Sequence, residues 1–280
     1  MDHRLVSGPP NGCTTVSRVA LNRVQSRAAV RGAIGVAAFL AVGEVIGRIG
    51  IVARNYLPPT SDVFEALWRM LRDEGFGTDV LVSTGNWLLG LASAIAIGVP
   101  LGLLLGSVPR LNEISRLVVE FLRPIPSVAL IPLAVFVFGT GTEMRVFVMT
   151  FAAVWPILFN TIYGLMEVDP LAKETARSYG CGRLAVALRV SLPSAAPFVL
   201  TGIRLAATTA LILEVTAEFF GGGGRGIGTV ISIASLGSGQ KDVVLAGAMV
   251  AGVLGLLANL ALEYGGRRGL VWAHQPGGAR

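Results

Sequence analysis

Charged residues are scarce in this sequence: they make up 14% of the 280 residues, whereas hydrophobic residues make up 53%. Such a chain is too apolar for an ordinary soluble domain. The charges gather between long apolar runs, which is the layout of a helical protein that crosses a membrane several times. The net charge of +6 would suit nucleic acid, but the basic residues lie beside the apolar runs and not in one block, so we expect no nucleic-acid partner.

Side chains that carry chemistry are also few. The two histidines, His3 and His274, lie in the terminal segments, and the two cysteines, Cys13 and Cys181, have no metal-ligand spacing around them. The stretch GGGGRGIG at 221–228 lacks the Gly-Lys-Ser/Thr ending of a phosphate-binding loop and follows no predicted strand. The sequence therefore predicts no catalytic residue, no metal site and no cofactor bound by this chain, and it favours a transport subunit over an enzyme.

Six apolar stretches predict an all-α transmembrane bundle of about six spans, at residues 32–51, 86–108, 124–138, 145–166, 197–220 and 243–264. The first stretch could instead be an amphipathic helix on the membrane surface or a cleaved signal peptide. The third is unusual, because Pro124, Pro126 and Pro132 interrupt it. Broken helices at membrane depth occur where protein or a water-filled cavity surrounds them.

The charge distribution predicts the arrangement of the segments. Residues 1–31 form a basic tail, and 32–79 hold the first span with an external amphipathic segment. Residues 80–265 form a core of five spans, and 266–280 form a second tail. Because basic residues gather on the cytoplasmic side of membrane proteins, six spans place both termini in the cytoplasm.

Several residues inside the spans are candidates for lining a translocation path. Prolines that break a helix, and polar or ionisable groups at membrane depth, usually face a cavity or the bundle interior. The candidates are Pro126, Pro132, Asn160, Thr208, Glu214 and Glu218. For the prolines a kinked packing helix is an equal alternative, and for Asn160 a hydrogen bond between helices is the plainer one. The glycine run at 221–224 predicts a flexible external loop.

One polar stretch, residues 167–193, separates the fourth and fifth spans; we call it the elbow. Asp169-Pro170 predicts a helix start, because proline fits the first turn of a helix. Gly180 and Gly182 predict a break, because glycine tolerates the backbone angles of a sharp turn. Helical spacing then resumes over 183–190. We therefore expect two short helices joined by a turn, with an ordinary cytoplasmic loop as the alternative.

The elbow resembles the EAA loop of ABC-importer permeases. That family's pattern is an acid followed by two alanines, a glycine, and a distant aliphatic-x-Leu-Pro. The matching residues here are Glu174, Thr175, Ala176, Gly180, Val190, Leu192 and Pro193. Thr175 replaces the first alanine and Val190 the usual isoleucine. Three further segments are similar in sequence to the nitrate/sulfonate/taurine branch of these permeases. They are LPPTSDVFEAL at 57–67, RPIPSVALIPL at 123–133 and AEFFGGGGRGIGTVI at 217–231.

The resemblance implies a type I, MetI-like importer permease from Trp87 onward, with one extra N-terminal helix, in the cytoplasmic membrane of a prokaryotic cell. It implies that the elbow docks on a separate ATPase subunit, which would bind and hydrolyse the ATP. The residues implied in this coupling are Glu174, Thr175, Ala176, Arg177, Gly180, Leu192 and Pro193. It further implies an external solute-binding protein, a second permease copy, surrounding membrane lipid, and a small anion such as a sulfonate, taurine or nitrate as the solute.

Two rival classes remain. A secondary transporter that works without ATP would usually show membrane-embedded coupling residues and a repeat between its two halves. No obvious repeat is present in the sequence. An integral membrane enzyme would need a polar catalytic cluster at membrane depth, and the sequence shows none.

Overall fold

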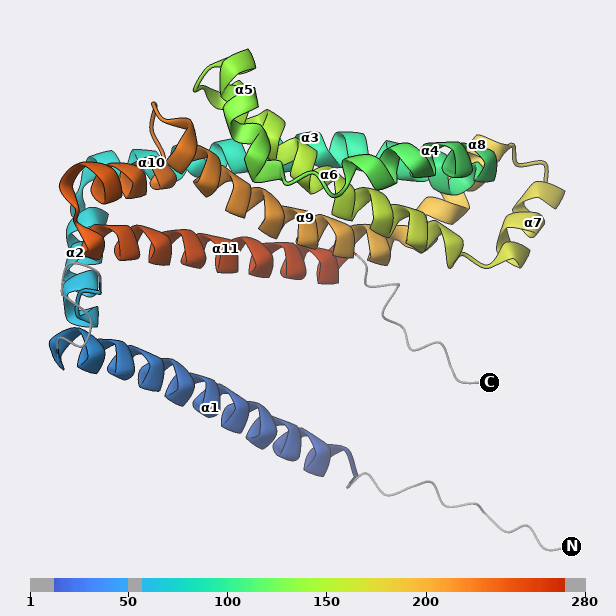
Figure 1. The fold of residues 1–280 in the computed structure, drawn as a ribbon. Helices are drawn as coiled ribbons and strands as arrows, with labels where there is room; N and C mark the ends of the chain where they lie inside the picture. Colours follow the sequence, from blue (N-terminus) through green and yellow to red (C-terminus); the bar gives the residue numbers. More distant parts are fainter. Residues whose placement is uncertain (1–12, 50–56, 270–280) are drawn as a thin grey trace, which may run out of the picture. The chain divides into compact units, whose positions relative to one another are not determined.

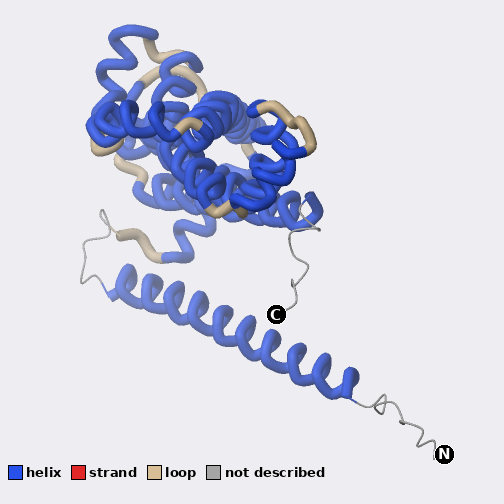
Figure 2. The backbone as a smooth tube through the Cα atoms, turned by 90° about the vertical axis from the view of Figure 1, so that its right-hand side faces the viewer, coloured by secondary structure: helices blue, strands red, loops and turns tan. Residues whose placement is uncertain are grey.

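The computed structural model describes residues 13–49 and 57–269, and helices are the regular elements of these ranges (Figure 2). The described chain divides into two units, one up to Phe64 and one from Glu65 onward. The elements in chain order are α1 Cys13–Ile49, α2 Thr60–Arg72, α3 Glu74–Ser107, α4 Pro109–Leu122, η1 Ser127–Leu130, α5 Ile131–Phe138, α6 Thr142–Met166, α7 Pro170–Ser178, α8 Arg183–Val186, η2 Ala187–Ser191, α9 Leu192–Gly221, α10 Ile227–Ser232, η3 Ile233–Ser238 and α11 Lys241–Gly269.

The N-terminal unit joins α1 to the start of α2. Its apolar part, Val30–Ile49, is long enough to cross a membrane, and the predicted basic tail is already helical from Cys13. Glu44 forms an ion pair with Arg48 one turn later. The Glu44 carboxylate also accepts hydrogen bonds from the backbone N–H (2.8 Å) and the hydroxyl (3.1 Å) of Ser61. Glu44 therefore serves as an acceptor for the start of α2, where helix N–H groups lack partners of their own.

The predicted number of spans holds with one correction. Within the described residues five helices are long and apolar enough to cross a membrane: Val30–Ile49, Glu74–Ser107, Thr142–Met166, Arg183–Gly221 and Lys241–Gly266. The predicted third span, 124–138, is not a helix of its own. It contributes η1 and α5, and together with α4 it makes a broken pair bent by 77°. Counting that pair as one span gives six. The prolines that interrupt the apolar run explain the break.

The second predicted span begins earlier than expected. The sequence placed its start at Asn86, where the apolar residues begin, but α3 begins at Glu74. Asp73 supplies the reason, because its carboxylate accepts the backbone N–H of Gly75 at 3.0 Å and so caps the helix. The added N-terminal turns carry polar side chains, including Asp79 and Ser83, that matter at the site described below.

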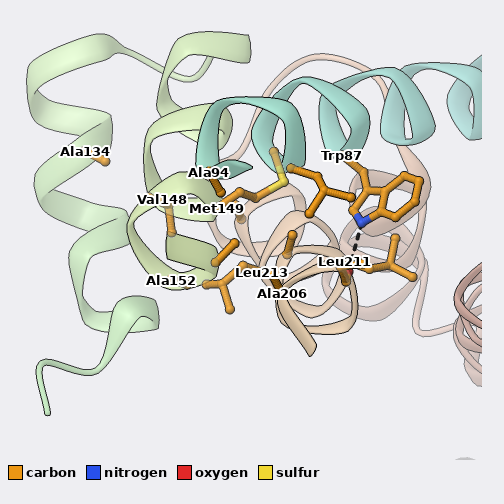
Figure 3. Close-up of a cluster of buried hydrophobic side chains, with 14 of the residues drawn as sticks. Trp87, Ala94, Ala134, Val148, Met149, Ala152, Ala206, Leu211 and Leu213 are labelled. Atoms are coloured by element: carbon orange, nitrogen blue, oxygen red, sulfur yellow. Dashed lines mark hydrogen bonds between the residues drawn. The ribbon is translucent and has the colours of Figure 1, made fainter. Parts of the chain in front are cut away.

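In the second unit α6 packs between α3 and α9, and α11 lies along α9 (Figure 1). Small residues bring α3 close to α6, because a Cβ atom on Gly90 or Gly98 would come within 2.9 Å of the Met149 or Ile157 side chain. Close approach through small residues is how membrane helices pack. Figure 3 shows the buried cluster around this contact, in which the Trp87 indole N–H donates to the carbonyl oxygen of Ala207 on α9 at 2.9 Å.

Candidate functional site

The elbow folds as the sequence predicted. The Asp169 carboxylate accepts the backbone N–H of Leu171 at 2.8 Å, and Pro170 occupies the first turn of α7. Helix α8 begins at Arg183, with Gly182 in extended backbone just before it. The chain then passes through a π-helical turn and enters α9 without a break. The elbow therefore connects the end of α6 directly to the start of α9 (Figure 1).

Gly180 closes α7 with a positive φ of 83°. Its N–H donates to the carbonyl oxygen of Arg177 at 2.9 Å, and the N–H of Cys181 donates to that of Ala176 at 3.1 Å. This pair of bonds around a left-handed residue is the Schellman ending of a helix. The backbone angle requires glycine here, but space does not, because a Cβ atom at Gly180 would meet nothing within 4 Å.

The surface of the elbow is open to solvent. Helix α7 has no buried residue, and the side chains of Glu174, Thr175 and Arg177 are exposed, with Ala176 intermediate. At the far end of the elbow Leu192 is intermediate and Pro193 exposed. Lys173 differs from these exposed side chains, because it is only half-exposed. The Lys173 ammonium folds back and donates to the carbonyl oxygen of Leu165 at 2.9 Å, where it serves the C-terminus of α6.

The path candidates are not brought together. Pro126 and Pro132 are exposed beside η1 and in the first turn of α5. The Asn160 amide donates to the carbonyl oxygen of Pro156 in its own helix at 2.8 Å, so its bond lies within α6 and not between helices as expected. Thr208 is exposed in an apolar groove of about 500 Å³ between α9 and α11.

Glu214 and Glu218 lie elsewhere, fully buried in α9 against α3 and α6. Arg145, which the sequence offered only as the start of a span, is buried beside them, with one guanidinium nitrogen 3.2 Å from Glu218 Oε1 and 4.0 Å from Glu214 Oε1. Ser83 and Asn86, which the sequence alone did not indicate, donate to these carboxylates. The signals in the sequence were Glu214 and Glu218 inside one apolar run and Arg145 at the start of another.

Arg204, which lies inside the predicted fifth span, is 3.9 Å from Glu263 of α11. Both side chains are about one third exposed, so this pair contributes little, roughly 0–1 kcal/mol. Among the described residues no three His, Cys, Asp or Glu side chains gather in a way that would hold a metal ion. The strongest polar features of the second unit are therefore an exposed elbow at one end of α6 and α9 and a buried ion-pair network at the other.

Comparison with known proteins identifies the chain's relatives. It is 32% identical over 194 residues to a putative ABC transporter permease protein of Methanocaldococcus jannaschii, covering 69% of this chain and 72% of that protein. It is 30% identical over 244 residues to the taurine transport system permease protein of Escherichia coli K12, covering 84% and 87%. It is 26% identical over 253 residues to a nitrate import permease protein of Synechocystis, covering 87% and 90%.

The fold resembles that of a solved transporter. A solved structure of the MetNI methionine ABC transporter in an inward-facing conformation aligns with a TM-score of 0.59 and 20% identity, over 66% of this chain and 92% of that chain. Residues 98–268 match the family described as "Binding-protein-dependent transport system inner membrane component". These matches confirm the predicted membrane permease fold and the prediction of a transport subunit and not an enzyme. The chain belongs to the inner membrane components of binding-protein-dependent transport systems, the permease subunits of ABC importers.

Proposed function

We propose that this chain is the permease of an importer for a small anion, and that its elbow couples the membrane spans to ATP hydrolysis on a separate ATPase subunit. The observation that carries the proposal is the elbow itself. It is a short helix and turn with no buried residue in α7, placed on the direct connection between two spans. A groove on a partner that gripped this helix would act on α6 and α9 together.

The solute class rests on the relatives. Proteins named for taurine, nitrate and bicarbonate transport are similar to this chain over most or two thirds of its length. All three solutes are small and carry an anionic oxygen group. We therefore expect a sulfonate, taurine, nitrate or related small anion, delivered by an external binding protein.

The assembly we propose contains two copies of this chain in lipid. The groove between α9 and α11 has Thr208 among otherwise mostly apolar side chains such as Leu211 and Ile212, and it is open in the single chain. Two such chains would supply two elbows for two ATPase subunits. A purified active complex that held one copy of this chain and no other permease would contradict the dimer.

The orientation we propose places both termini and the elbow in the cytoplasm. Reporter fusions near residues 65, 140 and 230 should then report the outside of the cell, and fusions near 115 and 180 the inside. An external signal at 180 would contradict the topology and the coupling role together.

The coupling role is tested with two elbow variants in the reconstituted transporter. Glu174→Ala removes a charge that can meet donors on the ATPase, and Gly180→Val forces a β-branched residue into a positive φ, at a local cost of about 1–3 kcal/mol. Both should abolish uptake and the stimulation of ATPase activity while the protein still reaches the membrane. Glu113→Ala, an exposed glutamate of α4, is the matched control and should transport normally.

Two results would count against this proposal. If both elbow variants took up solute at the parental rate with normal ATPase stimulation, the elbow would have no coupling role. If uptake by the parental chain persisted without any ATPase subunit, the chain would be a secondary transporter instead.

A further inference from the structure

Arg145, in the first turns of α6, is buried and holds a loop that belongs to another part of the chain. Its guanidinium donates to the carbonyl oxygens of Arg225 at 2.9 Å and Gly223 at 3.1 Å, and to the Glu218 carboxylate at 3.2 Å. Residues 222–226, the glycine-rich loop, connect α9 to α10. The sequence predicted a flexible loop here, whereas the structure binds it to the start of α6.

Glu218 uses both of its carboxylate oxygens in the same network. Oε1 accepts the hydroxyl of Ser83 on α3 at 2.7 Å, and Oε2 accepts the backbone N–H of Gly228 at 2.8 Å. Ser83 Oγ in turn accepts the N–H of Ile227 at 2.9 Å, and the Asp79 carboxylate accepts that of Gly226 at 3.2 Å. Three consecutive N–H groups at the start of α10 are therefore bound by side chains of α3 and α9.

Glu214, one turn earlier on α9, is equally buried but differently connected. Its Oε1 accepts the Asn86 amide at 3.0 Å and lies 4.0 Å from Arg145, and its Oε2 has no hydrogen-bond partner in the described chain. Within the described residues neither oxygen is hydrogen-bonded to the glycine-rich loop. Both glutamates are therefore buried on α9, but only Glu218 links the loop to α3 and α6.

The position of the Arg145–Glu218 pair connects it with transport. Arg145 lies on α6 and Glu218 on α9, the same two helices whose opposite ends the elbow joins. A movement of α6 relative to α9 that begins at the elbow must therefore either keep this pair or break it. Because a buried ion pair is a weak contributor to stability but costly to leave half-paired, it restricts the chain to arrangements that keep both partners together.

We propose that Arg145 and Glu218 are positioning residues for transport, which keep the ends of α3, α6 and α9 and the glycine-rich loop together as one unit while the elbow moves. This inference rests on the permease activity of the family and not on the solute or on the identity of the coupling residues. It predicts that the binding protein stimulates ATP hydrolysis only when the network is intact, even in variants that fold without the network.

The experiment compares Glu218→Gln with two matched variants in the complete transporter in proteoliposomes. Backbone amide exchange at residues 226–228 reports the loop directly and needs no knowledge of the solute. Glu218→Gln should raise these exchange rates at least about tenfold, because an amide N–H replaces one acceptor and Arg145 loses the nearer of its two carboxylate partners. Glu214→Gln should leave exchange at 226–228 within about twofold of the parent, because it makes no bond to the loop.

The second readout is ATP hydrolysis with and without the binding protein. In Glu218→Gln the ratio of the two rates should fall to about one, while the KM for ATP stays within about twofold of the parent. Glu143→Gln, an exposed glutamate two residues from Arg145, should keep the parental ratio. Arg145→Gln with Glu218→Gln removes both charges, so it tests the same loss of loop bonds if the single variant does not fold.

Three results would overturn the proposal. The first is parental exchange at 226–228 in Glu218→Gln or, where that variant does not fold, in the double variant. The second is fast exchange with normal stimulation by the binding protein, which would make the network structural only. The third is equal loop exchange in Glu214→Gln and Glu218→Gln, which would make buried charge and not the loop bonds the cause. A failure of the elbow variants above would leave the exchange result unaffected, so the two proposals fail separately.

Discussion

The two ends of α6 and α9 use the same kinds of residue for different purposes. At the elbow, glycine and a carboxylate lie in solvent, and the Glu174 side chain is exposed. At the glycine-rich loop, roughly 37 Å away along the 25 residues of α6, Gly226 and the Glu218 carboxylate are buried, and each is hydrogen-bonded to other groups of the chain. The elbow therefore has groups free for a partner, whereas the loop has its groups already bound within the chain.

Gly226 and Gly180 show the difference within one residue type. Both have positive φ angles, +148° and +83°. A Cβ atom on Gly226 would overlap the Glu218 carboxylate, whereas a Cβ atom on Gly180 would meet empty space. The elbow thus needs glycine for its backbone angle alone, and the loop needs it for angle and space together.

The largest expected effect is therefore that of Gly226→Ala. The added methyl must displace the Glu218 carboxylate from its donors while the backbone is also strained, so we expect a loss of at least about 3 kcal/mol of stability and little folded protein. Thermal unfolding of the purified protein in detergent measures this. Gly85→Ala in α3, where nothing lies within 4 Å, should unfold at or slightly above the parental temperature, because alanine favours a helix more than glycine does.

Asparagine substitution separates the two glycines. Asn tolerates the left-handed region near φ +60° better than other side chains, so Gly180→Asn should retain folded protein and most of the uptake, in contrast to Gly180→Val. Gly226→Asn should fail as Gly226→Ala does, because no space exists for its Cβ atom. The measurements are uptake and the amount of each variant in the membrane. If asparagine were tolerated equally at both positions, Gly226 would not differ from Gly180 in needing space as well as a backbone angle.

A smaller effect is expected inside the bundle, between the two ends. A Cβ atom on Gly102 of α3 would lie 2.6 Å from the Thr161 Cβ of α6, so Gly102→Ala should push these helices apart at a cost of about 1–3 kcal/mol. The thermal midpoint of the purified protein is the measurement. Stability equal to that of Gly85→Ala would mean that the helices can separate at this point without cost.

The smallest effect concerns the hydrogen bond between Trp87 and the carbonyl oxygen of Ala207. Trp87→Phe keeps an aromatic ring in the core but leaves this carbonyl without the indole donor, so we expect about 1 kcal/mol of destabilisation. The same thermal assay measures it. A loss as large as that of Gly226→Ala would indicate that packing around the indole, and not its hydrogen bond, dominates.

The sequence predicted the elbow well because its signals are local. A proline in the first turn of α7 and a glycine at its end lie within a dozen residues of one another, and each acts on its own backbone. The predicted start of the helix that begins at Glu74 was too late, because apolar content marks the hydrophobic part of a span and not the residue that caps its helix.

The buried network could not be predicted in the same way. Arg145 and Glu218 are 73 residues apart, and Ser83 and Glu218 are 135 apart. A single sequence shows that an ionisable residue lies in a span but not which other residue faces it. The bend between α4 and α5 was not predicted for a related reason, because the prolines indicate a break in the helix but not its angle.

The most direct test of the coupling role uses Cys181, the free and half-exposed thiol beside the turn of the elbow. In a Cys13→Ser background a maleimide reagent should label it in the permease alone, and the rate should fall at least about tenfold once the ATPase subunit is bound, because docking covers the turn. Thr140→Cys, exposed between α5 and α6, supplies a control thiol whose labelling should not change. Equal labelling of Cys181 with and without the ATPase subunit would contradict docking at the elbow.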